Sequence, residues 1–419
     1  MTSVSLVRDE YDAVVVGARC AGAATALLLA RRGLHVLAID RGQRGSDTLS
    51  THALMRAGVL QLRRWGLLEA VIATGVPPVR HAVFHYADAV AEVAVKSRDG
   101  VEALYAPRRT VLDSLLVDAA VAAGADAVHG VALGGLTLDR AGRVTGILVN
   151  NDKGVRRSIA AGIVIGADGL RSAVAQLVGA APYHVARHTS GVVYGYWSGL
   201  DLQGYHFYYR PGVSAGAIPT NDGQTCVFAS MPGARFQTEI RFDIAAGYRR
   251  VIAETEPPLA ARLSEATLAS RLKGFAGERG FFRQSWGPGW ALVGDAAYFK
   301  DPITAHGMTD ALRDAELLAR AVAEGSEQAL ADYQATRDDL SRRFHDTTDG
   351  IASFEWNLDE VQRMHRALSE EMAREVTFLG QLGAPAGAGA GEAPVGSPPA
   401  QLLAEPRPRT QPVALSGAQ

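Results

Sequence analysis

The stretch VVVGARCAGAATALLLARRGLHVLAID, residues 14–40, decides the fold. It begins with an apolar, β-branched run, turns at glycines, continues with small and apolar residues at helical spacing, and ends in a second apolar run. This order predicts a strand over 13–16, a helix over 21–32 and a second strand over 35–39. Together they form a βαβ unit, in which the two strands run parallel in one sheet.

The glycines and the closing acid of this unit have the order that dinucleotide binding requires. Gly17 permits a tight turn, Gly22 lets the helix approach the strand, and Asp40 ends the second strand, where a carboxylate accepts from a ribose hydroxyl. Arg19 replaces the middle glycine of the usual G-x-G-x-x-G, so an ordinary strand-turn-helix corner is the alternative. Cys20 is interpreted as a small packing residue of the turn.

The composition of the 419-residue chain narrows the class of protein. Its 42 Lys and Arg against 44 Asp and Glu give a net charge of -2, which provides no global attraction for nucleic acid or anionic lipid and favours small partners. The two cysteines, Cys20 and Cys226, cannot build a disulfide framework, which fits a reducing, cytoplasmic setting. The glycine-interrupted segment 14–30 is not a membrane span, no signal peptide is expected, and the oligomeric state stays open.

Two later segments each place an aspartate directly after a buried strand. They are GADGLRSAVA, residues 166–175, and ALVGDAAYFKDP, residues 291–302, which continues as PITAHGMT, residues 302–309. The helix expected after this last loop would direct the positive end of its dipole toward the loop. No metal-ligand cluster, P-loop or Ser-His-Asp arrangement is expected from the spacing of the residues.

The three segments together resemble the class A FAD-dependent monooxygenases of the para-hydroxybenzoate hydroxylase-like fold, from about residue 11 to 322. Their wider superfamily also contains geranylgeranyl reductase-like proteins and flavin-dependent halogenases. The resemblance implies an α/β fold: a Rossmann-like FAD-binding domain of the glutathione reductase type, an inserted β-sheet substrate domain and C-terminal helices. The FAD-binding domain would consist of residues 1–80, 109–186 and 286–325. The substrate domain would consist of a hairpin at 81–108 and a β-rich segment at 187–285. The resemblance further implies helices at 326–382 and a disordered tail at 383–419.

The resemblance also implies which residues contact FAD. The motif arginine before the helix expected over 109–123 is Arg109, and reduced flavin would place its negative edge against the amides of residues 307–309. The full set of implied cofactor-binding residues is Gly17, Ala18, Cys20, Ala21, Gly22, Asp40, Arg41, Arg109, Asp168, Gly169, Gly294, Asp295, Pro302, Gly307, Met308 and Thr309.

The resemblance implies reduction of FAD by NADH or NADPH, trapping of O2 as a C4a-hydroperoxyflavin, and hydroxylation or epoxidation of a small, mostly apolar or aromatic molecule. The candidate catalytic residue is His306, for proton transfer or substrate orientation, with a role in loop structure as the alternative. The candidate substrate residues are the aromatics of the β-rich segment, of which about half must face away from any pocket: Tyr194, Tyr196, Trp197, His206 and Tyr208.

Departures from the family pattern keep other functions open. Tyr298 replaces the histidine that commonly ends the family's GDAAH motif, which begins here at Gly294. In the loop PITAHGMT, Thr304 and Thr309 replace a glycine and an asparagine, and in the DG motif at Asp168–Gly169, Ala175 replaces the usual arginine. The alternatives are a geranylgeranyl reductase-type enzyme that adds hydride to an alkene, a flavin-dependent halogenase whose WxWxIP stretch is missing here, and a non-catalytic flavin-binding protein. His52 lies near the flavin in the resemblance, with helix capping or packing as the alternative.

Overall fold

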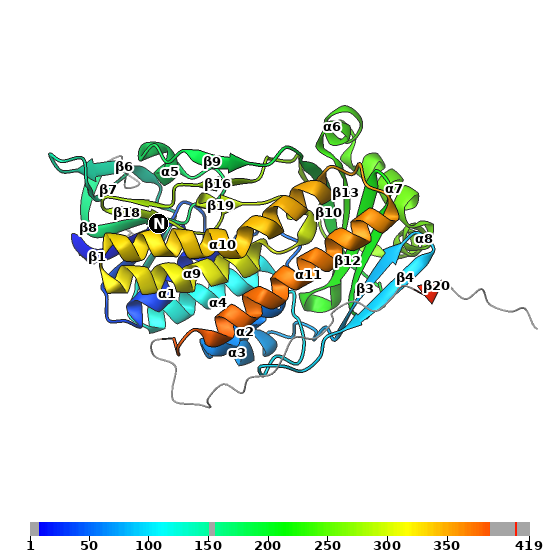
Figure 1. Cartoon of the computed structure of the whole chain (residues 1–419), viewed down its shortest axis with the longest axis horizontal. Helices are drawn as coiled ribbons and strands as arrows, with labels where there is room; N and C mark the ends of the chain where they lie inside the picture. The colour runs from blue at the N-terminus through cyan, green and yellow to red at the C-terminus, as the bar shows by residue number, and fades with distance from the viewer. Residues whose placement is uncertain (1–7, 151–155, 386–406, 409–419) are drawn as a thin grey trace, which may run out of the picture.

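The computed structural model describes residues 8–150, 156–385 and 407–408. Figure 1 shows a predominantly parallel sheet at one end of the long axis and a second sheet at the other, with long helices running between them. The expected α/β architecture with an additional sheet and C-terminal helices is confirmed.

The first sheet is built around the strand that opens the chain, β1 (Glu10–Val16). Its parallel neighbours are β2 (Val36–Asp40) and β8 (Arg156–Gly166), and helix α1 (Cys20–Ala30) connects β1 to β2. The sheet has the order β17-β18-β8-β1-β2-β5, and the β6–β7 hairpin pairs with β8. The remaining strands are β5 (Asp126–His129), β6 (Leu133–Leu138), β7 (Val144–Asn150), β17 (Trp286–Gly287) and β18 (Trp290–Leu292). The carboxyl ends of β1, β2 and β8 lie at one edge of the sheet, where a ligand of an open α/β sheet binds.

The second sheet is mostly antiparallel and includes the expected hairpin, which joins β11 in parallel. Its strands are β3 (His81–Tyr86), β4 (Ala89–Ala94), β10 (Ser190–Ser198), β11 (Tyr205–Arg210), β12 (Val213–Pro219), β13 (Gln224–Pro232), β14 (Thr267–Leu268), β15 (Lys273–Phe275) and β20 (Arg407–Pro408). A third, small sheet consists of β9 (Pro182–Val185), β16 (Phe281–Arg283) and β19 (Tyr298–Phe299).

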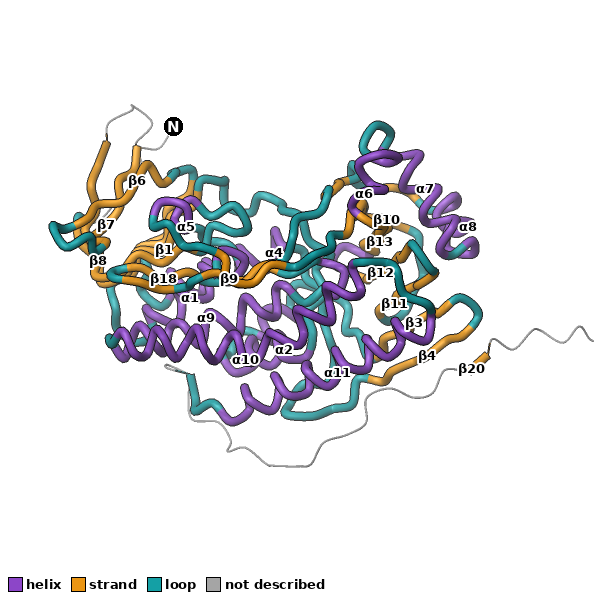
Figure 2. The backbone as a smooth tube through the Cα atoms, turned by 45° about the horizontal axis from the view of Figure 1, so that its top comes forward, coloured by secondary structure: helices purple, strands orange, loops and turns teal. Residues whose placement is uncertain are grey.

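Helices cover both sheets, and Figure 2 shows α11, which begins beside the second sheet and ends near α2. The helices around the first sheet and between the sheets are α2 (Arg56–Arg64), α3 (Leu68–Ile72), α4 (Arg109–Ala122), α5 (Ala173–Leu177), α9 (Gly307–Glu324), α10 (Glu327–Ala352) and α11 (Leu358–Gln381). The other helical segments are α6 (Gly233–Arg235), α7 (Ile244–Thr255), α8 (Pro257–Glu265), the 3-10 turns η1 (Asn221–Gly223), η3 (Gly294–Ala296) and η4 (Pro302–Thr304), and the π-helical η2 (Phe236–Ile240). None of the helices in the described residues is long and apolar enough to cross a membrane.

One apolar core joins the two regions. It contains Leu28 of α1, Leu312 of α9 and Leu379 of α11 together with Tyr196 and Phe207 from the second sheet. A separate core lies on the opposite face of the second sheet, under α7 and α8. The second sheet is therefore buried on both faces.

Three expectations differ from the structure. Apolar residues at helical spacing predict a helix over 48–68, but α2 begins only at Arg56, because residues up to Met55 are extended or irregular and His52 has a left-handed φ of 67°. The segment 187–285 contains α7 and α8 in addition to strands, since apolar residues at helical spacing, such as Tyr248, Val251 and Ile252, cover the outer face of the sheet. Residues 386–406 and 409–419 of the tail expected to be disordered lie outside the described residues, whereas Arg407–Pro408 pairs with β4.

A buried histidine in the joining core makes stability depend on pH. His365 of α11 hydrogen-bonds through Nδ1 to the Tyr86 hydroxyl at 2.8 Å, and burial lowers the pKa of its imidazole to about 3. The unfolded chain, with an ordinary histidine pKa of about 6.5, binds more protons between these values, so stability is complete above that window and is lost as the pH falls through it. We expect His365 to remove about 2 kcal/mol of unfolding free energy between pH 7 and pH 5.

Urea unfolding at both pH values, compared between the wild type and His365→Gln, measures this contribution. The glutamine keeps a polar partner for Tyr86 but does not titrate, so the variant is expected to lose less stability on acidification than the wild type. Equal losses in the two proteins would contradict the assignment to His365.

Candidate active site

The glycine turn after β1 brings three chain segments into direct contact. Gly17 has a left-handed φ of 101°, and a Cβ on Gly22 would lie 1.7 Å from the Gly17 carbonyl oxygen. The segment after β8 packs on the same turn, since a Cβ on Gly17 would lie 2.4 Å from the Ala167 carbonyl oxygen. Only glycine allows this approach, which places the N-terminus of α1 at the edge of the sheet.

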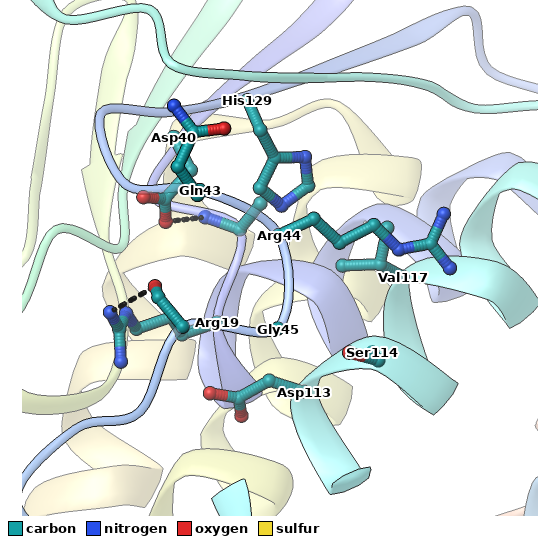
Figure 3. Close-up of a pocket in the computed structure, with 11 residues that line it drawn as sticks. Arg19, Asp40, Gln43, Arg44, Gly45, Asp113, Ser114, Val117 and His129 are labelled. Atoms are coloured by element: carbon teal, nitrogen blue, oxygen red, sulfur yellow. Dashed lines mark hydrogen bonds between the residues drawn. The ribbon is translucent and has the colours of Figure 1, made fainter. Parts of the chain in front are cut away.

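Asp40 organises a pocket beside this turn (Figure 3). Its carboxylate accepts from the backbone N–H of Ala18 at 2.9 Å and of Gly42 at 2.7 Å, so the side chain is fixed at the end of β2. The Arg19 guanidinium donates to the Ser46 hydroxyl at 3.2 Å across the pocket. The lining residues are Ala18, Arg19, Asp40, Gln43, Arg44, Gly45, Ser46, Asp113, Ser114, Val117 and His129. Arg41, expected among the binding residues, is exposed and does not line this pocket.

Farther along the same edge, Arg109 and Asp295 face the start of α1. Arg109 donates to Asp113 at 2.9 and 3.0 Å, and its charge acts on both Cys20 and Asp295. Desolvation raises the pKa of Asp295 to about 6, although part of the residue is exposed to solvent. This combination of desolvation and solvent access is expected for a carboxylate that lines a cleft.

Asp168 and Gly169 form the tight loop after β8. Gly169 has a φ of 79°, and the Asp168 carboxylate accepts from the Ser172 hydroxyl and from the Ala173 backbone N–H, at 2.6 Å for the latter. Because these acceptor sites are used at the start of α5, Asp168 shapes the loop that packs on Gly17.

The N-terminus of α9 forms the far end of the site. Ala305 has a left-handed φ of 51°, which turns the chain from η4 into α9, and Gly307 is exposed while Met308 and Thr309 are buried. A Cβ at Gly307 would meet no atom within 4 Å. The free amides of an 18-residue helix therefore open into space, where they would stabilise a negative charge.

The irregular segment before α2 lies against this helix terminus. Thr309 Oγ1 accepts from the Met55 backbone N–H at 3.1 Å, and the Ser50 hydroxyl is 3.9 Å from the Met308 sulfur. His52 of this segment has a left-handed backbone, and its Nε2 shares a hydrogen bond with the Tyr196 hydroxyl of the second sheet.

Tyr194 and Tyr196 of β10 form the opposite wall. The Tyr194 hydroxyl accepts from the Ser50 backbone N–H at 3.3 Å, and the Arg108 guanidinium carbon lies 3.6 Å from the centre of the Tyr196 ring. Burial, followed by the charges of Arg109 and Arg108, lowers the pKa of His52 to about 3, so its imidazole is neutral. The site therefore extends from the Asp40 pocket, past Asp295, to an aromatic wall across from the α9 terminus.

A family model described as an FAD binding domain matches residues 10–348. The chain belongs to this family of FAD-binding proteins. It is a flavoprotein and an FAD-dependent oxidoreductase. Its fold is shared by a probable FAD-dependent monooxygenase and by FAD-dependent halogenases.

Individual proteins share this flavoprotein's fold or sequence. Digeranylgeranylglycerophospholipid reductase 1 of Methanococcoides burtonii is 26% identical over 344 residues, covering 78% of this chain and 79% of that protein. The crystal structure of a probable FAD-dependent monooxygenase, PqsL of Pseudomonas aeruginosa, superposes with a TM-score of 0.73 at 20% identity, covering 85% of this chain and 99% of that one. The flavin-dependent brominase Bmp2 superposes with a TM-score of 0.73 at 18% identity, covering 88% and 93%.

The residues present fit FAD from end to end. The glycine cradle at Gly17 and Gly22 leaves no room for a Cβ, Asp40 is fixed at a pocket beside this turn, and the exposed Gly307 leaves the α9 amides accessible. FAD would thus lie with its adenosine at Asp40, its pyrophosphate near the start of α1, and its ring at Gly307. Bound there, it supplies the redox chemistry, while the chain binds and orients it.

Three of the five expected substrate residues face away from the flavin site. Trp197 donates to the Tyr248 hydroxyl at 3.1 Å in the core under α7, and Tyr208 belongs to the same outer core. His206 has the same parity on β11 as Tyr208 and stacks with it, and its Nε2 is 2.9 Å from the Gln203 carbonyl oxygen. The alternation along β10 and β11 therefore leaves Tyr194 and Tyr196 on the inner face. The inner aromatics of β11, which the sequence did not single out, are Tyr205, Phe207 and Tyr209.

His306, the candidate catalytic residue, is directed toward the C-terminal helices. It is 2% exposed, its Nε2 lies 2.9 Å from a Glu375 carboxylate oxygen of α11, and its ring stacks on Phe344 of α10. Burial lowers the pKa of the imidazole. The catalytic role expected for His306 is therefore corrected to a structural one, in which it ties the flavin loop to α10 and α11.

Charged side chains extend this contact into a buried network. Arg313 donates to Glu375 at 3.0 Å and pairs with Asp314 at 2.8 Å and Asp310 at 3.2 Å, and Lys300 pairs with Asp310. Lys300 and Arg313 thus provide cationic side chains where the imidazole of His306 and the carboxylates of Asp310 and Glu375 could otherwise suit a metal ion.

Lys300 and Asp301 lie in a polar loop, where the sequence favours a solvated charge pair over a catalytic role, but the structure buries both side chains. Lys300 and Asp301 are 5% and 3% exposed. Asp301 accepts from the Ser190 backbone N–H at 2.6 Å and from Ile303 at 3.0 Å, which joins the loop to β10.

Proposed function

We propose that the protein is an NAD(P)H- and O2-dependent monooxygenase that hydroxylates or epoxidises a small aromatic or mostly apolar substrate. The compact aromatic wall of Tyr194 and Tyr196 across from the Gly307 amides is the observation that carries this proposal. It supplies a partly desolvated place next to the position of the flavin ring, which oxygen transfer requires because water would discharge the reactive oxygen.

The space beyond this wall supports a short substrate. Tyr209 of β11 packs against Trp356 and His365, with ring centres 6.3 and 4.5 Å apart, and Tyr86 stacks on Tyr209. These contacts place aromatic side chains between the second sheet and α11, an arrangement that favours a short substrate over a long apolar chain. The proposal includes a cytoplasmic location, which the two buried free thiols Cys20 and Cys226 support.

The chain's own residues have definable tasks in this reaction. Backbone amides at 307–309 orient the flavin ring and stabilise negative charge on it, and Tyr194 and Tyr196 orient the substrate and exclude water. The neutral His52, hydrogen-bonded to the Tyr196 hydroxyl, can hold or pass a proton at its Nε2 atom.

A reductase acting on an alkene is the second candidate, because the curated relatives named digeranylgeranylglycerophospholipid reductases are 26% and 28% identical to this chain. Mass spectrometry separates the two functions. The FAD-loaded enzyme is supplied with NADPH or NADH, 18O2, a panel of small phenols and indoles, and a digeranylgeranylglycerophospholipid.

A product that is heavier by one 18O atom, with NAD(P)H consumed in step with it, is the expected result. Saturation of the lipid double bonds without incorporated 18O would assign the reductase function. NAD(P)H oxidation with neither product would contradict the proposed substrate class, since no small aromatic compound of the panel would then be oxygenated.

A further inference from the structure

Two histidines meet one carboxylate where β9 contacts α10. Nε2 of His184 lies 2.8 Å from Oδ1 of Asp346, and Nδ1 of His345 lies 3.3 Å from the same oxygen. His184 belongs to β9, whereas the other two are consecutive residues of α10. The three residues come from segments far apart in the chain, which is why residue spacing predicts no metal-ligand cluster.

The distances within this cluster suit a small tetrahedral ion. Zn²⁺ binds imidazole nitrogen and carboxylate oxygen at about 2.0–2.2 Å, so two of its ligand atoms in a tetrahedral site are about 3.3 Å apart. The two spacings to Asp346 are close to this value, and one ligand atom of each residue lies within 4.8 Å of the other two. The side chains of His184 and Asp346 are 32% and 52% exposed, so they are free to adjust around an ion.

The charge of Asp346 is available to a cation. Among the described residues, its ion-pair partners are the two imidazoles, and no arginine or lysine pairs with it. In the buried network around Glu375, by contrast, Lys300 and Arg313 already compensate the carboxylates. The cluster on β9 and α10 therefore lacks the cationic side chains that make a metal ion unnecessary in that network.

The protonation of the cluster also suits a metal ion. Burial lowers the pKa of His345 to about 4, so its imidazole is neutral at pH 7 and loses no proton before it binds an ion. Although desolvation acts to raise it, the hydrogen bonds from His184 and His345 hold the pKa of Asp346 below its usual value. At neutral pH the cluster therefore offers an anionic oxygen next to a neutral imidazole.

Packing fixes one of the three ligands in place. The side chain of His345 is 1% exposed, and its ring centre lies 5.0 Å from that of Phe282 and 6.0 Å from that of Tyr298. A Cβ at Gly280 would lie 2.7 Å from Nε2 of His345, so this nitrogen faces the chain, and Nδ1 is the nitrogen directed toward Asp346. The cluster thus combines one rigid imidazole with two adjustable side chains.

We propose that His184, His345 and Asp346 bind a divalent transition-metal ion of the Zn²⁺ type, which ties β9 to α10. Two imidazoles and one carboxylate select such an ion over Mg²⁺ or Ca²⁺, which prefer oxygen ligands. Because the cluster is exposed at Asp346, water can take the remaining coordination position. The ion would fasten α10 to the third sheet, in which β16 pairs with both β9 and β19.

Isothermal titration calorimetry of the FAD-loaded protein, first freed of metal ions with EDTA, tests the proposal with Zn²⁺ as the probe. We expect one Zn²⁺ to bind per chain. His184→Gln and Asp346→Asn are expected to weaken binding at least about 10-fold, since even the loss of a residue that only orients a metal ligand costs about 10–100-fold.

His35→Gln is the matched control for these variants. His35 also pairs with a single aspartate, Asp12, at 3.5 Å, and its side chain is 59% exposed. In the described residues this pair belongs to no group of three potential metal ligands. Zn²⁺ affinity in His35→Gln is therefore expected to equal that of the wild type.

Thermal unfolding gives a second readout that does not depend on catalysis. Zn²⁺ at about 100 times its Kd is expected to raise the Tm of the wild type and of His35→Gln by about 3 °C, because the ion binds the folded chain. The same concentration should leave the Tm of His184→Gln nearly unchanged, and Mg²⁺ should affect none of the three proteins.

No binding of Zn²⁺ to the wild type, equal Zn²⁺ affinity in the wild type and His184→Gln, or equally tight binding of Mg²⁺ would each overturn the proposed site. An equal rise of the Tm in His184→Gln would overturn the tie between β9 and α10. These measurements use neither NAD(P)H nor a substrate, so their outcome is independent of the oxygenation experiment.

Discussion

Gly22→Ala is expected to abolish the yellow colour of the purified protein. The added Cβ would lie 1.7 Å from the Gly17 carbonyl oxygen and 2.9 Å from the Gly17 carbonyl carbon, both backbone atoms that no side-chain rotation can move. Helix α1 must therefore shift away from the turn that would hold the FAD pyrophosphate. Overpacking of about 1–3 kcal/mol corresponds to an FAD affinity that is lower by up to about 100-fold.

Flavin fluorescence during titration of the apoprotein with FAD measures this loss, and thermal unfolding of the same samples reports the strain. Gly380→Ala is the matched control, since Gly380 lies in α11 with no atom within 4 Å of an added Cβ. Its helix propensity should rise by about 1 kcal/mol without an effect on FAD. Unchanged FAD affinity in Gly22→Ala would show that the close approach at this turn does not govern cofactor binding.

Arg313→Gln is expected to lower the free energy of unfolding by about 3–5 kcal/mol, because removing one partner of a buried ionic network leaves charges without compensation. Arg313 is 2% exposed and contacts Asp310, Asp314 and Glu375 within 3.2 Å. With the guanidinium absent, Lys300 is the remaining cationic partner among these side chains. Equilibrium unfolding in urea measures the change.

Arg343→Gln provides the comparison on the surface. Arg343 is 60% exposed and pairs with Glu370 at 3.1 Å and Glu371 at 3.0 Å, so its loss should cost less than about 1 kcal/mol. If Arg313→Gln were no less stable than Arg343→Gln, the buried network would have no net role in holding α9 against α11.

The fold of the βαβ unit at the start of the chain was predictable, because it depends on local constraints. Gly17, Gly22 and Asp40 lie within one βαβ unit, where backbone geometry allows few residue types at each position. The loops that contain Asp168–Gly169 and Gly294–Asp295 also follow directly after buried strands. Arg41 follows Asp40 in the sequence, but it is exposed and does not line the Asp40 pocket.

The aromatic residues of the second sheet that face the site were less predictable, because this depends on which face of each strand is turned inward. The run YHFYYR, residues 205–210, has aromatic side chains at both parities, so the sequence alone does not distinguish Tyr205 from Tyr208. The α7 and α8 helices decide the matter by covering the outer face. Arg108 was overlooked because the family motif drew attention to Arg109, the next residue along.

The burial of His306, Lys300 and Asp301 could not be predicted from the sequence, for a common reason. Charged side chains are rarely buried, and their compensating partners lie far along the chain. Glu375 is on α11, and Ser190 is on β10. A lysine and an aspartate in a polar loop therefore give no local indication that distant carboxylates and hydroxyls enclose them.

The apolar core that joins the two sheets has a consequence for how the protein folds. Tyr196 and Phe207 of the second sheet share it with Leu28 of the first region and Leu379 of the last helix. Neither region completes its interior by itself, since each would expose this apolar surface to water. The two sheets are therefore expected to unfold in a single cooperative transition. The aromatic wall and the glycine turn after β1 would then become ordered in the same folding step.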